Sequence, residues 1–422
     1  MPYFFIKRCK LLEKQATIWY NIEKTNEVFM ASLLLAIIYL AFISLGLPDS
    51  LLGSAWPEMH QVLGVELSAM GIVTTLIAVG TVISSLLSDR LTARFSTQII
   101  VSVSVGLTAI GLLGFSFAPT FAALCLFAIP YGLGAGSIDA ALNNYVALHY
   151  TSRHMSWLHC FWGVGTVVSP YVMSYALGTE LGWAGGYRIV GGIQIGILII
   201  LLATLPLWKK VGHTVSTASR EEEPRQSVGL IGSLKIKGVP YVLLGFLGYC
   251  AAESTVMVWA STYFFEAKST TEEVAAALGS LFFIGMTVGR FLSGLVSNRV
   301  GDKNMIRIGL AISAVGVITI AIPSSLPVAI VGFLLIGLGF APIYPSIIHS
   351  TPNSFGKENS QAIIGIQMAA AYFGATLAPP IFGLIANYVE IRLLPFYLAA
   401  FMALSLVMLE LLNKQGEEKN VK

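Results

Sequence analysis

The chain consists of apolar stretches of about twenty residues that alternate with short polar segments. A helix rises about 1.5 Å per residue, so such a stretch crosses the roughly 30 Å of hydrocarbon in a bilayer. A β-barrel would instead show segments of about ten residues with alternating hydrophobicity. The pattern predicts twelve membrane-spanning helices, over residues 29–52, 68–88, 97–117, 121–147, 156–178, 187–208, 239–264, 274–297, 304–322, 327–349, 360–387 and 392–412.

Composition supports this prediction, since 55% of the 422 residues are hydrophobic and only 11% are charged. In a water-soluble domain about a quarter of all residues are charged. The lipid bilayer is therefore the expected surrounding of the chain. We expect the protein to be a monomer within it.

The basic residues are distributed unevenly between the loops. Of the 25 Lys and Arg, only Arg188, Lys268 and Arg392 fall on one side of the predicted spans and Arg290 falls inside one. Positively charged loops stay in the cytoplasm, so both termini are predicted to be cytoplasmic. The net charge of +3 is not gathered on a soluble face, and a nucleic-acid partner is not expected. Compact loops without Asn-x-Ser/Thr acceptors favour a bacterial plasma membrane.

Several kinds of chemistry are not indicated. The four cysteines show no pair spacing, which argues against a disulfide or zinc framework. His149, His154 and His159 recur every fifth residue and fall on different helix faces, so a shared metal is not expected. A Walker sequence is absent, and ATP is not expected to drive the protein. A cleavable signal peptide is not evident, although Met30 remains an alternative start.

Three sequence matches indicate that the chain is a duplicated six-helix unit. Segments that begin at Ser85, Gly132 and Gly165 align with segments 209, 205 and 209 residues further on. Similarity by chance would not keep the offset nearly constant, and many transporters arise from two such repeats. The expected fold is an all-α membrane protein of two pseudo-symmetric six-helix bundles. Its predicted parts are an extension (1–28), a first half (29–208), a linker (209–238), a second half (239–412) and a tail (413–422).

The segment after the second span resembles the loop signature of the major facilitator superfamily, a family of secondary transporters. That signature reads roughly Gly-x-Leu-x-Asp-Arg-x-Gly-Arg-Lys, and the segment of residues 85–94 keeps Asp89, Arg90 and Arg94. Ser85 and Thr92 replace its two glycines. The resemblance covers the chain from about residue 30 to residue 412.

The second copy of this loop departs from the signature differently. It keeps Gly294 and Gly301 but has Asn298, followed by Arg299, where the acid usually stands. The resemblance implies that both loops form a cytoplasmic gate that holds the two halves together. Simple positive-inside anchoring is the alternative, and it explains the arginines but leaves Asp89 unexplained.

Ionisable residues inside the spans are the strongest functional signal. Each costs about 2.5–3.5 kcal/mol at a helix centre, so such residues usually serve a function. They are Asp49 in the first span, Asp139 in the fourth, His159 in the fifth, Glu253 in the seventh and Arg290 in the eighth.

Two of these acids stand in segments that resemble the fucose permease branch of the superfamily. Pro48-Asp49-Ser50-Leu51 has one acid in the first span, and Asp139 in the fourth is followed four residues later by Asn143. The resemblance implies proton-coupled sugar uptake, with Asp49 and Asp139 as the protonated pair. A helix-capping role is the alternative for Asp49. For Asp139, the lane of small residues beside it, including Gly132 and Gly136, either packs on a helix or lines a cavity.

Glu253 has two interpretations of equal weight: it contacts the solute, or it forms an ion pair with Arg290. A sugar presents an apolar face to aromatic rings and hydroxyls to amides and carboxylates. The predicted solute contacts are therefore Asn143, Glu253, Trp56, Trp162, Trp259, Tyr344, Gln367 and His159.

The sequence thus favours a proton-coupled symporter of a small polar solute, most simply a sugar, that needs no cofactor. Sodium in place of the proton is one alternative, because carboxylates bind either ion. Export of drugs or amphiphiles is another, since a Gly- and Pro-containing fifth span is common in antiporters and residues 163–170 match that pattern incompletely. A polytopic enzyme or a receptor is a third, but no cluster of catalytic groups and no large soluble domain is apparent.

Overall fold

The computed structural model describes residues 29–66, 69–208, 229–270, 272–322 and 325–421, so the predicted extension 1–28 and most of the linker lie outside it. Within these ranges the protein is helical apart from turns and short connections. Eleven of the described helical spans are long and apolar enough to cross a membrane. The remaining predicted span corresponds to α6, a helix of 26 residues with more polar side chains. The prediction of an all-α membrane protein is confirmed.

The helix boundaries follow the predicted spans closely, and α4 coincides with the predicted range 97–117. The helices are 29–46, α2 (Leu51–Val62), α3 (Met70–Phe95), α4 (Thr97–Phe117), α5 (Phe121–His149), α6 (Ser152–Leu177), α7 (Gly182–Ala203), α9 (Gly229–Leu234), α10 (Val239–Lys268), α11 (Glu272–Gly279), α12 (Leu281–Val300), α13 (Asp302–Ala321), α14 (Leu326–Phe340), α15 (Ile343–Phe355), α16 (Lys357–Tyr388), η2 (Ile391–Leu393) and α17 (Leu394–Val421).

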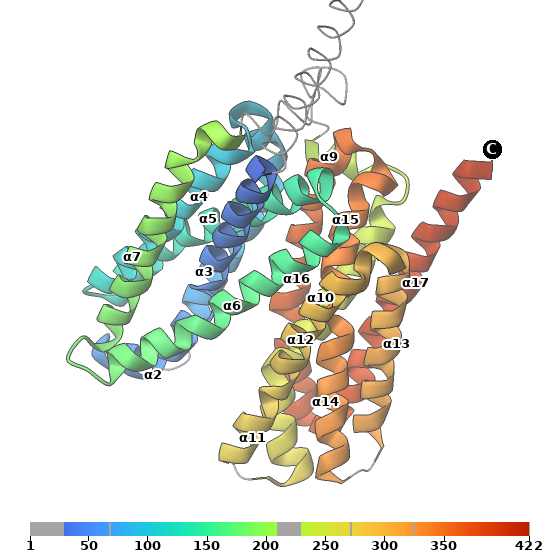
Figure 1. Cartoon of the computed structure of the whole chain (residues 1–422). Helices are drawn as coiled ribbons and strands as arrows, with labels where there is room; N and C mark the ends of the chain where they lie inside the picture. The colour runs from blue at the N-terminus through green and yellow to red at the C-terminus, as the bar shows by residue number, and fades with distance from the viewer. Residues whose placement is uncertain (1–28, 67–68, 209–228, 271, 323–324, 422) are drawn as a thin grey trace, which may run out of the picture.

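The helices form two bundles that correspond to the two predicted halves (Figure 1). In the first half α5 packs on α3 and α4, and α4 packs on α7; in the second, α10 packs on α16 and α17, and α12 and α13 pack on α14. Between the halves α3 packs on α16, and α6 packs on α12. These are the second span of each half against the fifth span of the other, the relation expected from a duplicated unit. The bundles meet at one end and diverge at the other, here called the closed end and the open end (Figure 1).

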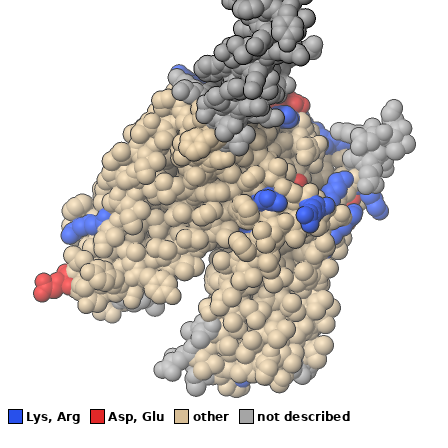
Figure 2. Space-filling model, viewed as in Figure 1, with Lys and Arg blue, Asp and Glu red and all other residues tan. Residues whose placement is uncertain are grey.

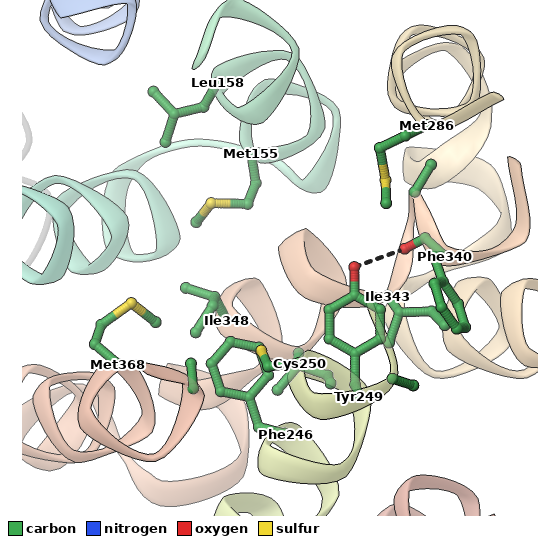
Figure 3. Close-up of a cluster of buried hydrophobic side chains, with 14 of the residues drawn as sticks. Met155, Leu158, Phe246, Tyr249, Cys250, Met286, Phe340, Ile343, Ile348 and Met368 are labelled. Atoms are coloured by element: carbon green, nitrogen blue, oxygen red, sulfur yellow. Dashed lines mark hydrogen bonds between the residues drawn. The ribbon is translucent and has the colours of Figure 1, made fainter. Parts of the chain in front are cut away.

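Among the spans that were predicted as continuous, the eighth is divided into α11 and α12 at Ser280, and the first and the tenth are interrupted next to a proline. The first helix ends at Gly46, and a turn around Pro48 precedes α2. The tenth span divides into α14 and α15 at Ala341 and Pro342. Proline removes a backbone donor and ends regular helix bonding, which accounts for the breaks in the first and the tenth span. At the break in the tenth span the Tyr249 hydroxyl donates to the Phe340 carbonyl over 3.1 Å (Figure 3).

Small residues allow α5 to approach α3 closely. A Cβ atom added at Gly132 or Gly136 would overlap the carbonyl oxygens of Ile77 or Thr81. The hydroxyls of Thr81 and Ser85 donate to the carbonyls of these two glycines over 3.1 and 3.2 Å. The glycines of the lane beside Asp139 therefore pack on a helix, whereas Ala135 and Asp139 of the same lane line a cavity. Such small-residue contacts are typical of helix pairs in membranes.

An apolar cluster joins the two halves on the closed side of the molecule. Met155 and Leu158 of α6 belong to the same buried cluster as Phe246, Ile348 and Met368 of the second half, and all five are fully buried (Figure 3). Because these side chains come from both bundles, their packing holds the halves together without any charge.

We predict that Gly136→Ala destabilises the protein. The added methyl group overlaps the α3 backbone, and overpacking of this kind costs about 1–3 kcal/mol. Gly192→Ala on α7 is the matched control, because a Cβ atom there meets nothing within 4 Å. Both changes bring the same gain in helix propensity, about 0.5–1 kcal/mol. Thermal unfolding in detergent should show a lower Tm for Gly136→Ala only, and equal Tm values would contradict the packing described.

Candidate functional site

A cavity of about 510 Å³ lies between the two halves and is lined by residues of both. The gap between the bundles at the open end is visible in the space-filling view (Figure 2). Most of the lining is aliphatic or aromatic, and none of the described residues that line it is Asn or Gln. Five ionisable side chains interrupt this apolar surface: Asp49, Asp139, His159, Glu253 and Arg290. These are the five in-span groups that the sequence singled out.

Asp49 lies at the break of the first span and is exposed to the cavity. Its carboxylate accepts hydrogen bonds from the Trp162 indole at 2.9 Å and from the Tyr131 hydroxyl at 3.3 Å. Trp162 reaches it because Gly46, which lacks a side chain, lets the α6 backbone approach the first helix closely. Since both bonds come from side chains, the carboxylate does not act as the helix cap that was considered as an alternative.

Asp139 lies deeper in the cavity and is only 5% exposed. It accepts a hydrogen bond from Asn143, one turn further along α5, at 2.7 Å. A second bond, at 3.1 Å, comes from the hydroxyl of Tyr372 on α16. Tyr372 belongs to the other half, so this carboxyl group connects the two bundles through a neutral partner.

Glu253 and Arg290 form the ion pair that was one of the two interpretations of Glu253. The closest nitrogen and oxygen atoms are 3.4 Å apart, and the two side chains are 12% and 6% exposed. The Arg290 guanidinium also lies 5.1 Å from the centre of the Trp162 ring and 3.5 Å from the His159 carbonyl oxygen. Arg290 thus reaches from the second half to the first.

Four of the predicted solute contacts line the cavity, and a fifth lies directly behind them. Trp162, Tyr344, His159 and Glu253 line the cavity together with the two aspartates. Asn143 is fully buried behind them, where its side-chain oxygen contacts His159 Nε2 at 3.1 Å. Asn143 therefore supports Asp139 and His159 and does not reach the cavity surface.

Three predicted solute contacts lie away from the cavity. Trp56 is 2% exposed and packs in the core of the first half, because α2 begins after the break and turns this ring inward. Gln367 is fully buried and accepts a hydrogen bond from Thr351. The Trp259 indole donates to the Pro379 carbonyl at 2.9 Å and lies against Phe382. These placements correct the sequence-based assignment.

Tyr131 and Tyr372, the hydroxyl donors to the two aspartates, were not among the predicted site residues. Tyr131, Ala135 and Asp139 are four residues apart and share the cavity-lining face of α5, so this spacing was a usable signal. Tyr372 carries no such signal, because it reaches Asp139 across 233 positions of the chain.

The predicted gate residues lie at the closed end, but they contribute unequally. Asn298 accepts a hydrogen bond from the backbone N–H of Arg153, in the other half, at 3.1 Å. Asp89 and Arg90 line a small pocket together with Ala362 and Ile366 of α16. Arg94 lies over the ring of Phe95, and Arg299 is exposed.

One set of polar contacts between the halves at the closed end involves an acid that was not among the predicted gate residues. Asp302 accepts from the Ser152 hydroxyl of the first half at 2.6 Å and contacts His349 Nδ1 at 2.6 Å. The other ring nitrogen of His349 contacts the Tyr150 carbonyl oxygen of the first half at 3.2 Å. This closed-end clamp, formed by Asp302, His349, Ser152 and Tyr150, replaces the acid that Asn298 lacks. Four positions separate Asp302 from Asn298 in the loop.

Several known proteins of similar sequence are described as transporters. The family model of the Major Facilitator Superfamily matches residues 38–269 and, in a second match, residues 242–422. The uncharacterized transporter y4wD of Sinorhizobium fredii is 27% identical over 379 residues, which cover 86% of this chain and 95% of that protein.

Solved structures with a similar fold include two transporters of the same superfamily. The superfamily transporter FucP in its outward conformation superposes with a TM-score of 0.73 at 14% identity, covering 90% of this chain and 98% of that one. The proton:xylose symporter XylE bound to 6-bromo-6-deoxy-D-glucose gives a TM-score of 0.73 at 14% identity, covering 92% and 96%. The two matched segments together span nearly all of the described helices, and the chain belongs to the Major Facilitator Superfamily of membrane transporters.

Proposed function

We propose that this chain is a proton-coupled transporter that carries a small polar solute, a sugar, into the cell. One observation carries the proposal: Asp139 is buried between the halves with the neutral partners Tyr372 and Asn143. A carboxyl group held this way can exist in protonated and ionised forms, because no fixed cation compels it to stay charged. Protonation changes its bond with Tyr372 and so acts on the interface between the halves.

Asp49 provides a second protonation site nearer the open end. It is exposed to the cavity, whereas Asp139 is buried. A proton that enters from the open end therefore meets Asp49 first. Two carboxyl groups at different depths suit a carrier that takes up a proton on one side and releases it on the other.

The proposed conformation is outward-facing. In the view of Figure 2, most of the visible Lys and Arg atoms gather towards the closed end. By the positive-inside rule this end faces the cytoplasm. The solute then enters from outside, the open end closes over it, and the closed-end clamp and the apolar cluster separate to release it inside.

The solute is proposed to be a sugar on the basis of the cavity's size and groups. Its volume of about 510 Å³ lies within the range of roughly 300–1,000 Å³ of small-molecule sites. Trp162 and Tyr344 offer ring faces, and three carboxylates offer acceptors for hydroxyl groups. Two solved structures of proton symporters for the sugars xylose and fucose share the fold.

Export of an amphiphile is the second candidate, and one observation favours it. The cavity lining is mainly apolar, and the amides of Asn143 and Gln367 are buried away from it. A carrier of amphiphiles needs apolar surface more than hydroxyl-binding amides. Efflux of a fluorescent amphiphilic cation from vesicles would favour this candidate.

We predict that Asp139→Asn abolishes accumulation of the solute. One charge moving through 100 mV gains about 2.3 kcal/mol, which supports roughly 50-fold accumulation. Without a titrating group at position 139 the expected ratio of the inside to the outside concentration of a neutral hexose falls to about 1, because its movement is no longer linked to the gradient. Proteoliposomes with a proton gradient, a sodium gradient or neither, and a panel of labelled hexoses, provide the measurement.

Counterflow exchange of labelled for unlabelled solute is the control, since it needs no net proton movement and should survive in Asp139→Asn. Glu180→Gln, an exposed carboxylate in the loop after α6, should accumulate like the wild type. Full accumulation by Asp139→Asn would refute its role as the coupling site. Accumulation driven only by a sodium gradient would show that the coupling ion is sodium and not the proton.

We predict that Asp302→Asn weakens the contacts between the halves at the closed end, so that this end opens more often. The change removes the charge that binds Ser152 and His349, and a charged hydrogen bond contributes about 1.5–3 kcal/mol. A loss of only about 1.4 kcal/mol raises the open population roughly tenfold. A cysteine at Ser360, a residue buried at the same end against Asn144, should then react correspondingly faster with an impermeant maleimide in a background without the native cysteines.

Glu410→Gln is the matched control for this experiment. It breaks the pair with Arg307, whose N–O distances are 2.6 and 2.7 Å, but this pair joins two helices of the same half. Labelling of the cysteine should stay at the wild-type rate in the control. Equal rates in both variants would show that the clamp does not hold the halves together.

A further inference from the structure

Arg290 has much of its hydrogen-bonding capacity unused. A guanidinium group carries five N–H donors. Its two oxygen contacts, to Glu253 at 3.4 Å and to the His159 carbonyl at 3.5 Å, are long compared with the roughly 2.7–2.9 Å of a charged hydrogen bond. Nε is buried without a partner, and the residue is 5% exposed. Burying a cation whose N–H donors lack acceptors costs free energy, so we infer that a ligand supplies the missing acceptors.

The same chain contains an arginine pair with close geometry. Arg307 binds Glu410 through two nitrogens, at 2.6 and 2.7 Å, although both side chains are substantially exposed. The Glu253 pair is buried, where a close bidentate contact would be worth more. Glu253 nevertheless contacts Arg290 through a single oxygen. The contrast indicates that the Arg290 site is shaped to hold a further acceptor group.

The surroundings of Arg290 favour an anionic group. Arg290, Glu253, Trp162 and Tyr344 all line the cavity, whose other surfaces are mainly apolar. In apolar surroundings the attraction between a guanidinium and a carboxylate is stronger than in bulk water. The flat guanidinium matches a carboxylate through two parallel hydrogen bonds, and the ring of Trp162 supports its plane.

We propose that the transported solute carries a carboxylate, as a sugar acid does, and that this carboxylate binds Arg290 in place of Glu253. This inference rests on the proposed transport of a sugar-sized solute through the cavity. Glu253 accepts a proton when it leaves Arg290, so the site holds one cation and one anion both before and after binding. Each bound anion therefore takes up one proton. A phosphate ester is a poorer match, because its two charges would meet a single cation.

Calorimetric titration of the purified protein with D-glucuronate and D-glucose tests the proposal. The wild type should bind glucuronate at least about tenfold more tightly than glucose, and glucuronate affinity should fall as the pH rises, by at most about tenfold per unit. Glu253→Gln frees Arg290 from its competitor. It should bind glucuronate more tightly than the wild type does, with most of the pH dependence lost. A purely structural ion pair would give weaker binding in this variant.

The double variant Arg290→Gln with Glu253→Gln leaves no unpaired charge, and its Tm reports whether it folds. It should bind both sugars alike. Wild-type protein that binds glucose as tightly as glucuronate would overturn the carboxylate proposal, and so would tighter binding of glucose 6-phosphate.

Proton-driven accumulation of labelled solute separates this inference from the proposed function. If glucose accumulates and the protein does not bind glucuronate more tightly than glucose, the proposed sugar transport stands but Arg290 is not a carboxylate-binding residue. Binding of a short aliphatic carboxylate that depends on Arg290, without accumulation of any sugar, would keep the anion site and remove the sugar.

Discussion

The cost of placing charge in hydrocarbon governs this structure. Each ionisable group in a span must face protein or a water-filled space, and all five in-span groups lie at one cavity between the halves. Their contacts run from Asp49 through Trp162 and Arg290 to Glu253, and separately from Asp139 to Tyr372. Both routes cross the interface between the bundles. The groups that would destabilise an isolated helix therefore contribute to the connection between the two halves.

Most of the fold could be predicted because the hydrophobic stretches and the repeat are local or periodic signals. The predicted range 97–117 coincides with α4, and the hydrophobic stretch 156–178 predicts α6 despite its polar side chains, with the match of Gly165 to Gly374 in agreement. Breaks inside spans were less accessible. Pro48 and Pro342 mark two of them, but Pro130 and Pro170 lie inside continuous helices, so proline alone does not locate a break.

The charged residues of the candidate site could be predicted from the sequence. The residues whose place in the site depends on how a helix is rotated could not. Asp49, Asp139 and Glu253 stood out because a carboxylate in an apolar span has few alternative explanations. Trp56 and Gln367 were misplaced because a helix buried on several sides has no polar face that reports its rotation. The pairing of Asp302 with His349 was also hidden, since these residues are 47 positions apart and their contacts with the first half depend on the assembled bundles.

The break between α14 and α15 has a mechanical consequence. A continuous membrane helix transmits a tilt along its whole length, whereas two short helices joined at Ala341 and Pro342 can bend at the joint. The Tyr249 hydroxyl satisfies the carbonyl at this joint, so bending does not leave a bare polar group in the hydrocarbon. The two helices can therefore tilt relative to one another, and the two ends of the carrier need not move as one rigid body.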